Sequence, residues 1–133
     1  FEETWVQVAV KQVAAALQYM HSAGVIHCDL KPGNTMLLKE VELEDATLPH
    51  CLLVDFGLSE VCEQKGAGPA RVKGTPLYLS PEGFEGHLTE RSDMWALGVM
   101  IFEMLTGHRP FQDSSGSIFV LWSKVAKTEP KLE

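Results

Sequence analysis

Four side chains suited to phosphate and metal chemistry lie close together in the first half of the sequence. Asp29 and Asp55 each follow a short apolar segment, and Asp55 precedes a Phe-Gly pair at which the backbone can turn. Asn34 adds a neutral oxygen ligand, and Lys31 adds a mobile positive charge suited to a phosphate oxygen. Carboxylate and amide oxygens suit Mg²⁺, which keeps several waters and often shares a phosphate. Taken alone, either aspartate is more typical of a helix or strand cap, so the surrounding elements matter.

A long helix is predicted ahead of Asp29. Thr4 and Gln7 have the spacing of a capping box, and Gly24 follows as a C-terminal stop. Between them, apolar residues repeat at intervals of three and four: Val6, Ala9, Val10, Val13, Ala16, Leu17 and Met20. The pattern therefore predicts a helix over residues 4–21 that packs on one face.

Two short apolar runs are expected to form a β-hairpin. Residues 35–38 (TMLL) and 51–54 (CLLV) have the length and the bounding residues of short strands. The acidic, turn-rich stretch between them, roughly residues 39–50, is predicted to be a solvated connection, with a partner-binding site as the alternative. Residues 57–74 are rich in glycine and lack periodicity, which predicts a long loop of the kind that is often functional or mobile.

Two more helices are predicted in the second half of the chain. Apolar residues nearly encircle a helix that begins near Thr89 and runs through residues 92–107, which indicates burial on most sides. Gly107 and Pro110 are expected to end it. A last short helix is predicted across residues 117–127, after a Ser/Gly turn. With the hairpin, these elements give one domain with an α+β, mainly helical fold.

The composition limits the function classes. Of the 133 residues, 45% are hydrophobic and 22% are charged, which is enough for a core and unlike a disordered tail. The net charge of −7 argues against a nucleic-acid partner. Cys28, Cys51 and Cys62 form no CxxC pair, so the sequence predicts a reducing, cytoplasmic (intracellular) location without disulfides or zinc. No apolar run approaches the roughly 18 residues that span a bilayer.

Four motifs in succession resemble those of eukaryotic protein kinases. Residues 27–34 (HCDLKPGN) resemble the catalytic loop, and residues 55–57 (DFG) resemble the magnesium motif. Residues 74–82 (GTPLYLSPE) resemble the substrate-docking stretch, and residues 92–111 resemble the buried helix that anchors the larger lobe. The order and spacing of all four fit, and the resemblance covers nearly the whole chain. It implies the C-terminal lobe of the protein-kinase-like fold, incomplete, with a short β-hairpin.

The resemblance implies a role for each candidate side chain. Asp29 would be the catalytic base, which accepts or orients the proton of the substrate hydroxyl, and Lys31 would steady the transferred phosphoryl group. Asn34 and Asp55 would be ligands of Mg²⁺, and Met36 would lie under the adenine of ATP. The implied cofactors are therefore ATP and Mg²⁺, and the implied substrate is a protein.

Other residues would position these groups. Thr75 would bridge toward the catalytic aspartate and lysine, and we count it as catalytic. His27 and Phe56 would pack into an internal column that aligns the two loops. Asp93 would cap the backbone of the catalytic loop, and Glu82 would brace the docking stretch. The lysine of the catalytic loop together with Thr75 resembles serine/threonine-specific members, so transfer to Ser or Thr hydroxyls is expected.

Cys28 stands where the family commonly has arginine. That arginine normally receives a phosphate from the activation loop, which a cysteine cannot do. Between Asp55 and Gly74, Ser59 is the only hydroxyl residue. We therefore hypothesise that activation does not depend on phosphorylation of this loop. A redox sensor is an alternative for Cys28, but a neighbouring carboxylate should raise the pKa of a thiol, and a small packing residue is the simpler interpretation.

The subfamily is indicated only weakly. The stretch DFGLSE and the long hairpin connection resemble the calcium- and calmodulin-dependent branch. Gly33 replaces a glutamate that helps some members to recognise basic substrates, so no preference for basic substrates is predicted. The sequence contains no D-x-D-x-D-G calcium loop, and a calcium response would require residues beyond Glu133.

Other motifs of the kinase family do not occur in this sequence. It has neither a G-x-G-x-x-G loop nor a V-A-I-K lysine, which the family carries in a smaller lobe. We therefore expect residues 1–133 to be a partial kinase domain, without the small lobe and the last helices, and with regulatory domains outside it. The isolated chain is expected to bind ATP poorly and to be inactive. The arginine partner of Glu82 is expected beyond residue 133.

Three functions remain open on these grounds. The favoured one is a Ser/Thr protein kinase, because the catalytic and metal-binding residues are intact. The second is a pseudokinase or scaffold whose lobe binds a protein partner without catalysis. The third is a truncated gene product with no function of its own. An in-frame glycine-rich loop and V-A-I-K lysine would favour the enzyme.

Overall fold

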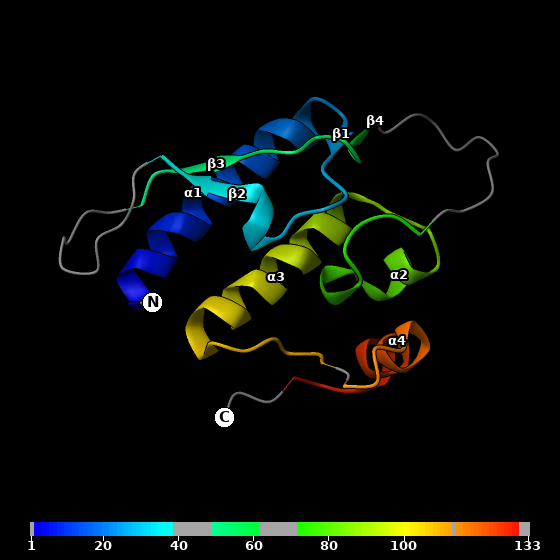
Figure 1. Ribbon diagram of the computed structural model, residues 1–133. Helices are drawn as coiled ribbons and strands as arrows, with labels where there is room; N and C mark the ends of the chain where they lie inside the picture. Colours follow the sequence, from blue (N-terminus) through cyan, green and yellow to red (C-terminus); the bar gives the residue numbers. More distant parts are fainter. Residues whose placement is uncertain (1, 39–48, 62–71, 113, 131–133) are drawn as a thin grey trace.

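Two long helices form the centre of the molecule. They are α1 (Glu3–Ser22) and α3 (Glu90–Thr106), which lie side by side (Figure 1). A ribbon of two strands, β2 (Thr35–Leu37) and β3 (Cys51–Leu53), lies against α1. This mainly helical α+β arrangement confirms the predicted fold class. The structure is a computed structural model that describes residues 2–38, 49–61, 72–112 and 114–130.

Helix α1 buries its apolar stripe as predicted. It is one residue longer at each end than the predicted helix, and its buried residues are Val6, Ala9, Val13 and Leu17. The predicted capping box was wrong, because the N-cap is Glu2 and no side chain caps the helix. Gln7 instead donates from Nε2 to Oε1 of Glu3, at 3.2 Å. Gly24 follows the helix at a φ of 73°, a left-handed conformation that favours glycine.

The β2–β3 ribbon is the predicted hairpin, and α1 fixes its position. The strands are antiparallel, with Thr35 opposite Leu53. On α1, Gln12 donates from Nε2 to the carbonyl oxygen of Pro49 at 2.7 Å and accepts from the backbone N–H of Cys51 at 2.8 Å. One side-chain amide therefore satisfies a backbone donor and a backbone acceptor at the start of β3.

A second, shorter ribbon was missed by the sequence analysis. Strand β1 (Val25–Ile26) pairs antiparallel with β4 (Glu60–Val61), so the predicted loop over residues 57–74 contains a strand. Strands of two residues are too short to show an alternating pattern. Residues 62–71 and 39–48 lie outside the described residues, so the character of the remaining loop and of the hairpin connection stays a prediction.

Helix α3 has the predicted termini. Thr89 and Ser92 form a reciprocal capping box at its start, and Gly107 ends it at a φ of 77°. Its inward face packs on α1 through Ala96, Leu97, Val99 and Met100. Met94 and Leu105 are exposed, however. The prediction of burial on most sides is therefore correct only for the face that meets the other described elements.

Three short elements position the loops that carry the candidate site. They are two 3₁₀ turns, η1 (Pro32–Asn34) and η2 (Pro76–Tyr78), and the one-turn helix α2 (Pro81–Phe84). Each begins with a proline, whose fixed φ suits the first position of a helix. The sequence analysis did not predict them, because their length gives no periodic signal.

Helix α4 (Ile118–Lys127) closes the molecule near α2 and η2. It confirms the predicted helix over residues 117–127, with Ser117 as its N-cap. It contributes to a small second core of Phe111, Leu121 and Val125. The Trp95 ring of α3 stacks on Phe111, with 5.9 Å between ring centroids. None of the described helices combines the length and apolar character needed to cross a membrane.

Candidate active site

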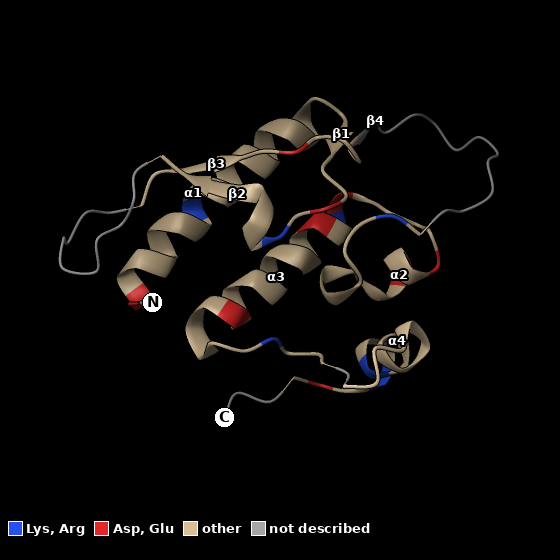
Figure 2. Ribbon diagram, in the orientation of Figure 1, with Lys and Arg blue, Asp and Glu red and all other residues tan. Residues whose placement is uncertain are grey.

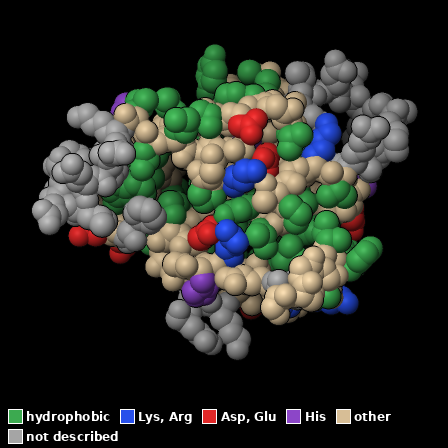
Figure 3. All heavy atoms as spheres, viewed as in Figure 1, with side chains coloured by type: hydrophobic (Ala, Val, Ile, Leu, Met, Phe, Trp, Pro, Cys, Tyr) green, Lys and Arg blue, Asp and Glu red, His purple; other side chains and the backbone are tan. Residues whose placement is uncertain are grey.

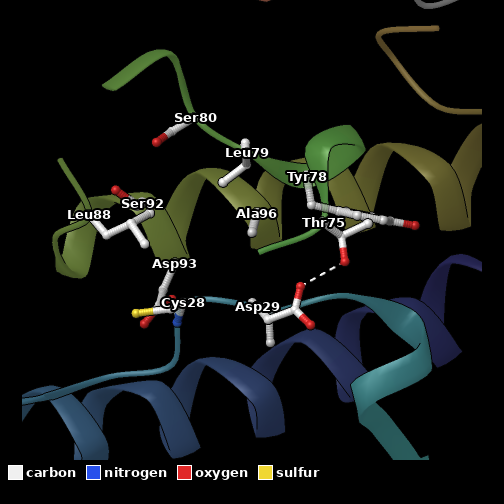
Figure 4. A pocket seen from close by; sticks show the side chains of 11 residues that line it. Cys28, Asp29, Thr75, Tyr78, Leu79, Ser80, Leu88, Ser92, Asp93 and Ala96 are labelled. Atoms are coloured by element: carbon white, nitrogen blue, oxygen red, sulfur yellow. Dashed lines mark hydrogen bonds between the residues drawn. The ribbon is translucent and has the colours of Figure 1, made fainter. Parts of the chain in front are cut away.

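The carboxylate of Asp29 is the centre of a compact hydrogen-bonded cluster. It is buried, and Thr75 Oγ1 donates to its Oδ1 at 2.7 Å. Lys31 Nζ donates to Oδ2 at 2.7 Å, and Asn34 Nδ2 donates to the same oxygen at 3.1 Å. Figure 4 shows Asp29 and Thr75 facing each other across a pocket lined by the catalytic loop and by the segment around η2. Both carboxylate oxygens are therefore held in place.

Lys31 and Thr75 also contact each other. Lys31 Nζ donates to Thr75 Oγ1 at 2.7 Å, so the three side chains form a closed triangle with Asp29. The bridge that the kinase resemblance implied for Thr75 is thus present. The same triangle joins two segments far apart in the sequence, the loop after β1 and the loop before η2.

The electrostatic balance around Asp29 favours its ionised form. Burial raises the pKa of this carboxyl, but hydrogen bonds from Lys31, Thr75 and Asn34 and the charge of Lys31 outweigh burial. The pKa of Asp29 therefore lies below its ordinary value. At neutral pH, Asp29 is therefore a charged hydrogen-bond acceptor.

Asp93 holds the backbone of the catalytic loop from the start of α3. Its Oδ2 accepts from the backbone N–H of His27 at 2.9 Å, and its Oδ1 accepts from that of Cys28 at 3.0 Å. This confirms the predicted cap. The sequence analysis missed a third partner, His21 near the end of α1, whose Nε2 lies 2.8 Å from Oδ2. No local pattern indicates this contact, because the two residues are 72 positions apart.

The loop needs a left-handed backbone at Cys28, which has a φ of 69°. The carbonyl oxygen of Cys28 faces Gly74, where an added Cβ atom would lie only 2.5 Å from it. Gly74 itself has a φ of 93°. A glycine is therefore required where the two loops meet, both for space and for backbone conformation. The Cys28 side chain is buried, and its Sγ lies 3.6 Å from the carbonyl oxygen of Ile26.

His27 connects the catalytic loop with the DFG segment. The imidazole is fully buried, its Nδ1 accepts from the backbone N–H of Asp29, and its Nε2 lies 3.3 Å from the carbonyl oxygen of Val54. Its ring lies 5.5 Å from that of Phe56, centroid to centroid. The two rings are in contact, as the predicted internal column requires, but Phe56 is 52% exposed, so the described residues do not enclose the column at Phe56.

Asn34 and Asp55 lie at the same end of the β2–β3 ribbon. The backbone N–H of Val54 donates to the carbonyl oxygen of Asn34 at 2.9 Å, which extends the pairing of the two strands by one residue. Asp55 follows directly, in an exposed position and with a φ of 62°. The structure thus brings Asp29, Lys31, Asn34 and Thr75 into direct contact, while Asp55 and Met36 lie outside this contact network.

Acidic and basic side chains lie close together at this site. Figure 2 shows charged residues of both signs where the catalytic loop passes the N-terminal half of α3. In the space-filling view, acidic and basic side chains meet near the centre of the face, with hydrophobic side chains around them (Figure 3). Such a mixture suits a charged ligand at a largely apolar surface.

Comparison with known proteins decides the family. Residues 1–129 match the family model described as the protein kinase domain. The chain belongs to the protein kinase family. The matched residues include both segments that resemble kinase motifs, residues 27–34 around Asp29 and residues 55–57.

Similar proteins are named as protein kinases, and some of them as serine/threonine-protein kinases. The chain is 37% identical to serine/threonine-protein kinase ULK3 of Xenopus laevis over 116 residues, which are 86% of the chain and 23% of that protein. It is 34% identical to human 3-phosphoinositide-dependent protein kinase 1 over 132 residues, or 97% of the chain and 22% of that protein. It is 40% identical to serine/threonine-protein kinase pkn3 of Myxococcus xanthus over 112 residues, which are 80% of the chain and 20% of that protein. The chain thus spans less than a quarter of the length of these kinases.

Protein kinases as a family use ATP and Mg²⁺, and the described oxygen ligands fit a partial magnesium site. Asn34 uses its amide nitrogen on Asp29, which leaves its amide oxygen for a ligand. Within the described parts of the chain, the exposed carboxylate of Asp55 accepts one contact, of 3.3 Å, from the backbone N–H of Gly57. Among the described residues no group of three or more His, Cys, Asp or Glu could hold a metal alone. Two hard oxygens suit Mg²⁺, because water and phosphate oxygens complete its shell.

Met36 is placed where a flat apolar group could bind. It lies directly opposite Leu52 across the ribbon, so both side chains share one face. Met36 is 56% exposed and Leu52 is 44% exposed, which leaves two apolar side chains open on one face of the ribbon. An adenine ring could stack there, and the predicted role of Met36 stays a prediction.

The docking stretch is braced within the chain. Ser92 donates from Oγ to Oε1 of Glu82 at 2.9 Å, which links α2 to the capping box of α3. Burial raises the pKa of Glu82, but hydrogen bonds from its own backbone, Ser80 and Ser92 and the charge of Arg91 outweigh burial and lower it. The sequence analysis predicted that Glu82 braces this stretch but did not identify Ser92 as its partner.

Proposed function

We propose that this chain is the larger lobe of a serine/threonine protein kinase. The lobe would transfer the terminal phosphoryl group of Mg-ATP to a Ser or Thr hydroxyl of a protein substrate. Residues 1–133 would then be a partial kinase domain, completed by a smaller lobe that carries the glycine-rich loop and its lysine. The family match and the intact catalytic loop support this proposal.

The observation that carries the proposal is the environment of Asp29. Its ionised carboxylate is held at both oxygens, and one of its partners is a lysine that reaches a second segment through Thr75. A substrate hydroxyl that approaches Asp29 beside Thr75 would meet an acceptor for its proton. Lys31 would then balance charge on the phosphoryl oxygens. Positioning and charge are the main requirements of this reaction.

The metal ligands would have a separate task. Asn34 and Asp55 would hold Mg²⁺, which supplies positive charge to the phosphate oxygens of ATP. Asn34 also donates to Asp29 through its amide nitrogen, at 3.1 Å. One side chain could therefore set the distance between the metal and the catalytic carboxylate. Met36 would support the adenine from below.

The specificity for Ser and Thr rests on the pair of Lys31 and Thr75. Their 2.7 Å hydrogen bond lies directly beside Asp29, so the acceptor hydroxyl would have to come close to the catalytic-loop backbone. A short Ser or Thr side chain suits that position. We expect peptides that carry Ser or Thr to be phosphorylated and the matched Tyr peptide to be left unmodified.

The test is phosphoryl transfer by the full-length protein that contains this chain. Transfer from Mg-ATP to a generic Ser/Thr peptide should be abolished by Asp29→Asn and by Asp55→Ala. Glu85→Gln is the matched control, because Glu85 is exposed and removal of its charge should leave transfer unchanged. Folded wild-type protein that shows no transfer would reject the proposal and favour a pseudokinase or scaffold.

A further inference from the structure

Tyr78 anchors the docking stretch to α3. Its side chain is 7% exposed, and its hydroxyl group donates to Oε2 of Glu103 at 2.6 Å. Figure 4 shows the Tyr78 side chain extended along α3, while Thr75, in the same stretch, faces Asp29. The sequence analysis assigned no role to Tyr78 or to Glu103.

Arg109 completes this anchor from the segment after α3. Its Nε lies 3.2 Å from Oε1 of Glu103, and its guanidinium carbon lies 5.8 Å from the centroid of the Tyr78 ring. The Nε–H group makes no aligned hydrogen bond among the described residues, so the contact acts through charge. Arg109 therefore meets both partners, the carboxylate by charge and the ring by a cation–π contact.

The anchor and the catalytic cluster are joined through a single 3₁₀ turn. In η2, the backbone N–H of Tyr78 donates to the carbonyl oxygen of Thr75 at 2.9 Å. Thr75 in turn donates to Asp29 at 2.7 Å. A turn this short cannot move at Tyr78 without moving Thr75, because no flexible segment separates them.

We propose that Arg109 is a positioning residue for phosphoryl transfer, which holds Thr75 against Asp29 through Glu103 and Tyr78. This inference rests on the proposed kinase function. The positive charge of Arg109 keeps the Glu103 carboxylate beside the Tyr78 hydroxyl. Without that charge, a partly buried carboxylate loses its counterion and turns toward water. The Tyr78 hydroxyl then loses its acceptor, and η2 releases Thr75.

The direction of two pKa shifts agrees with this coupling. Burial first, and then the Glu103 carboxylate, raise the pKa of Tyr78, so the phenol stays protonated and donates. The hydrogen-bonding partner Tyr78 and the charge of Glu103 raise the pKa of Arg109. Arg109 acts on the phenol in the opposite direction and lowers the pKa of Tyr78, so the protonated phenol depends on burial and on Glu103.

The test compares Arg109→Gln, Arg109→Lys and Tyr78→Phe in the full-length protein. Arg109→Gln should lower kcat by about tenfold and leave the KM for ATP within about twofold, because it affects the transfer geometry and not nucleotide binding. Arg109→Lys keeps the charge and should recover most of the loss. Adding Arg109→Gln to Tyr78→Phe should cost little more than Tyr78→Phe alone. Lys127→Gln, which removes one exposed positive charge, is the control.

Hydrogen exchange of the backbone amides of residues 75 and 77–79 gives a readout that needs no catalysis. Exchange should be faster in Arg109→Gln than in wild type, and close to wild type in Arg109→Lys. Unchanged exchange, or additive losses of kcat in the double variant, would overturn the role of Arg109. A wild-type protein without phosphoryl transfer would reject the kinase proposal, while the exchange rates would still decide whether Arg109 orders this turn.

Discussion

Asp29 and Asp55 are two acidic residues of one candidate site, but their surroundings differ in almost every respect. Asp29 is buried, its pKa is lowered, and three side chains donate to its carboxylate. Asp55 is exposed, and its carboxylate accepts one 3.3 Å contact from its own turn. The part of the site that would orient a substrate hydroxyl is therefore fixed by the chain. Asp55, one of the two proposed metal ligands, is not.

Backbone conformation also distinguishes the surroundings of Asp29 from those of Asp55. Among the described residues, Cys28 and Asp55 are the non-glycine residues with positive φ, a conformation that costs about 1–2 kcal/mol. At Cys28, the Asp93 carboxylate accepts hydrogen bonds from the backbone N–H groups of His27 and Cys28, and these offset the cost. At Asp55, no comparable set of contacts does so within the described residues. A strained residue without compensation is expected where a ligand supplies the missing contacts.

The largest effect on stability should come from Asp93, which holds the backbone next to Asp29. Asp93→Asn replaces one acceptor oxygen by an amide group that must face a donor, at a buried residue with three partners. We expect a loss of about 3–5 kcal/mol in the free energy of unfolding, as for other broken buried charge networks. Urea unfolding measures it, with Glu85→Gln as the exposed control. A loss below about 1 kcal/mol would contradict the assigned role of Asp93.

The next prediction compares how the stability contributions of Asp29 and Asp55 depend on pH. The folded pKa of Asp29 lies below its ordinary value, so its ionisation contributes stability above the unfolded pKa, near 4, and this contribution is lost as the pH falls through the folded value. Asp29→Asn should therefore lower the free energy of unfolding by about 2 kcal/mol at pH 7, and the difference from wild type should shrink below about pH 4.

Asp55→Asn provides the comparison for that measurement. Because Asp55 is exposed and makes one long contact, its difference from wild type should be small at every pH. An Asp29→Asn difference that stays constant from pH 7 to pH 3 would show that its hydrogen bonds stabilise the fold without any preference for the ionised form.

The elements of the fold differ in how far the sequence predicted them. The helices α1, α3 and α4 and the β2–β3 ribbon follow from apolar periodicity, because each is long enough to show its repeat or its bounding turns. The β1–β4 ribbon does not, since two residues cannot alternate. The exposed face of α3 was also misjudged, because a sequence shows which residues are apolar but not whether anything covers them.

Within the site, the motifs predicted the candidate residues and part of their support, such as the cap by Asp93, but not the contacts of His21 and Arg109. Asp29, Lys31 and Asn34 lie in one loop, and their proximity could be predicted from spacing alone. The contact of Thr75 with Asp29 came only through the kinase resemblance, because 46 positions separate the two residues. His21 and Arg109 had no such signal. A lone histidine at a helix end and an arginine in a turn are common surface features.

A smaller change in stability, of opposite sign, should follow a substitution at Asp55. Asp55→Gly removes the left-handed strain at a φ of 62°, and we expect a gain of about 0.5–1 kcal/mol in the free energy of unfolding. The same change removes a proposed metal ligand. In the full-length protein, Mg²⁺ should then no longer strengthen ATP binding, as measured by calorimetry. Destabilisation by Asp55→Gly would mean that contacts within the chain hold this residue after all.

The smallest expected effect concerns phosphorylation of the loop that contains Ser59. Cys28 is buried and turned toward the carbonyl oxygen of Ile26, so it presents no positive charge to a phosphate. Ser59 is the only hydroxyl residue between Asp55 and Gly74, and its Oγ already donates to the carbonyl oxygen of His27 at 3.2 Å. We therefore expect phosphatase treatment of active full-length protein to leave kcat unchanged.

Phosphate mapping before and after that treatment shows whether the loop carried a phosphate at all. Ser59→Ala removes one hydrogen bond, worth about 0.5–1.5 kcal/mol, and should lower stability slightly without abolishing transfer. Loss of activity on phosphatase treatment, together with a mapped phosphate on Ser59, would contradict the hypothesis. The catalytic loop would then depend on a modification, and its order could not be attributed to Asp93 and the contacts of Asp29 alone.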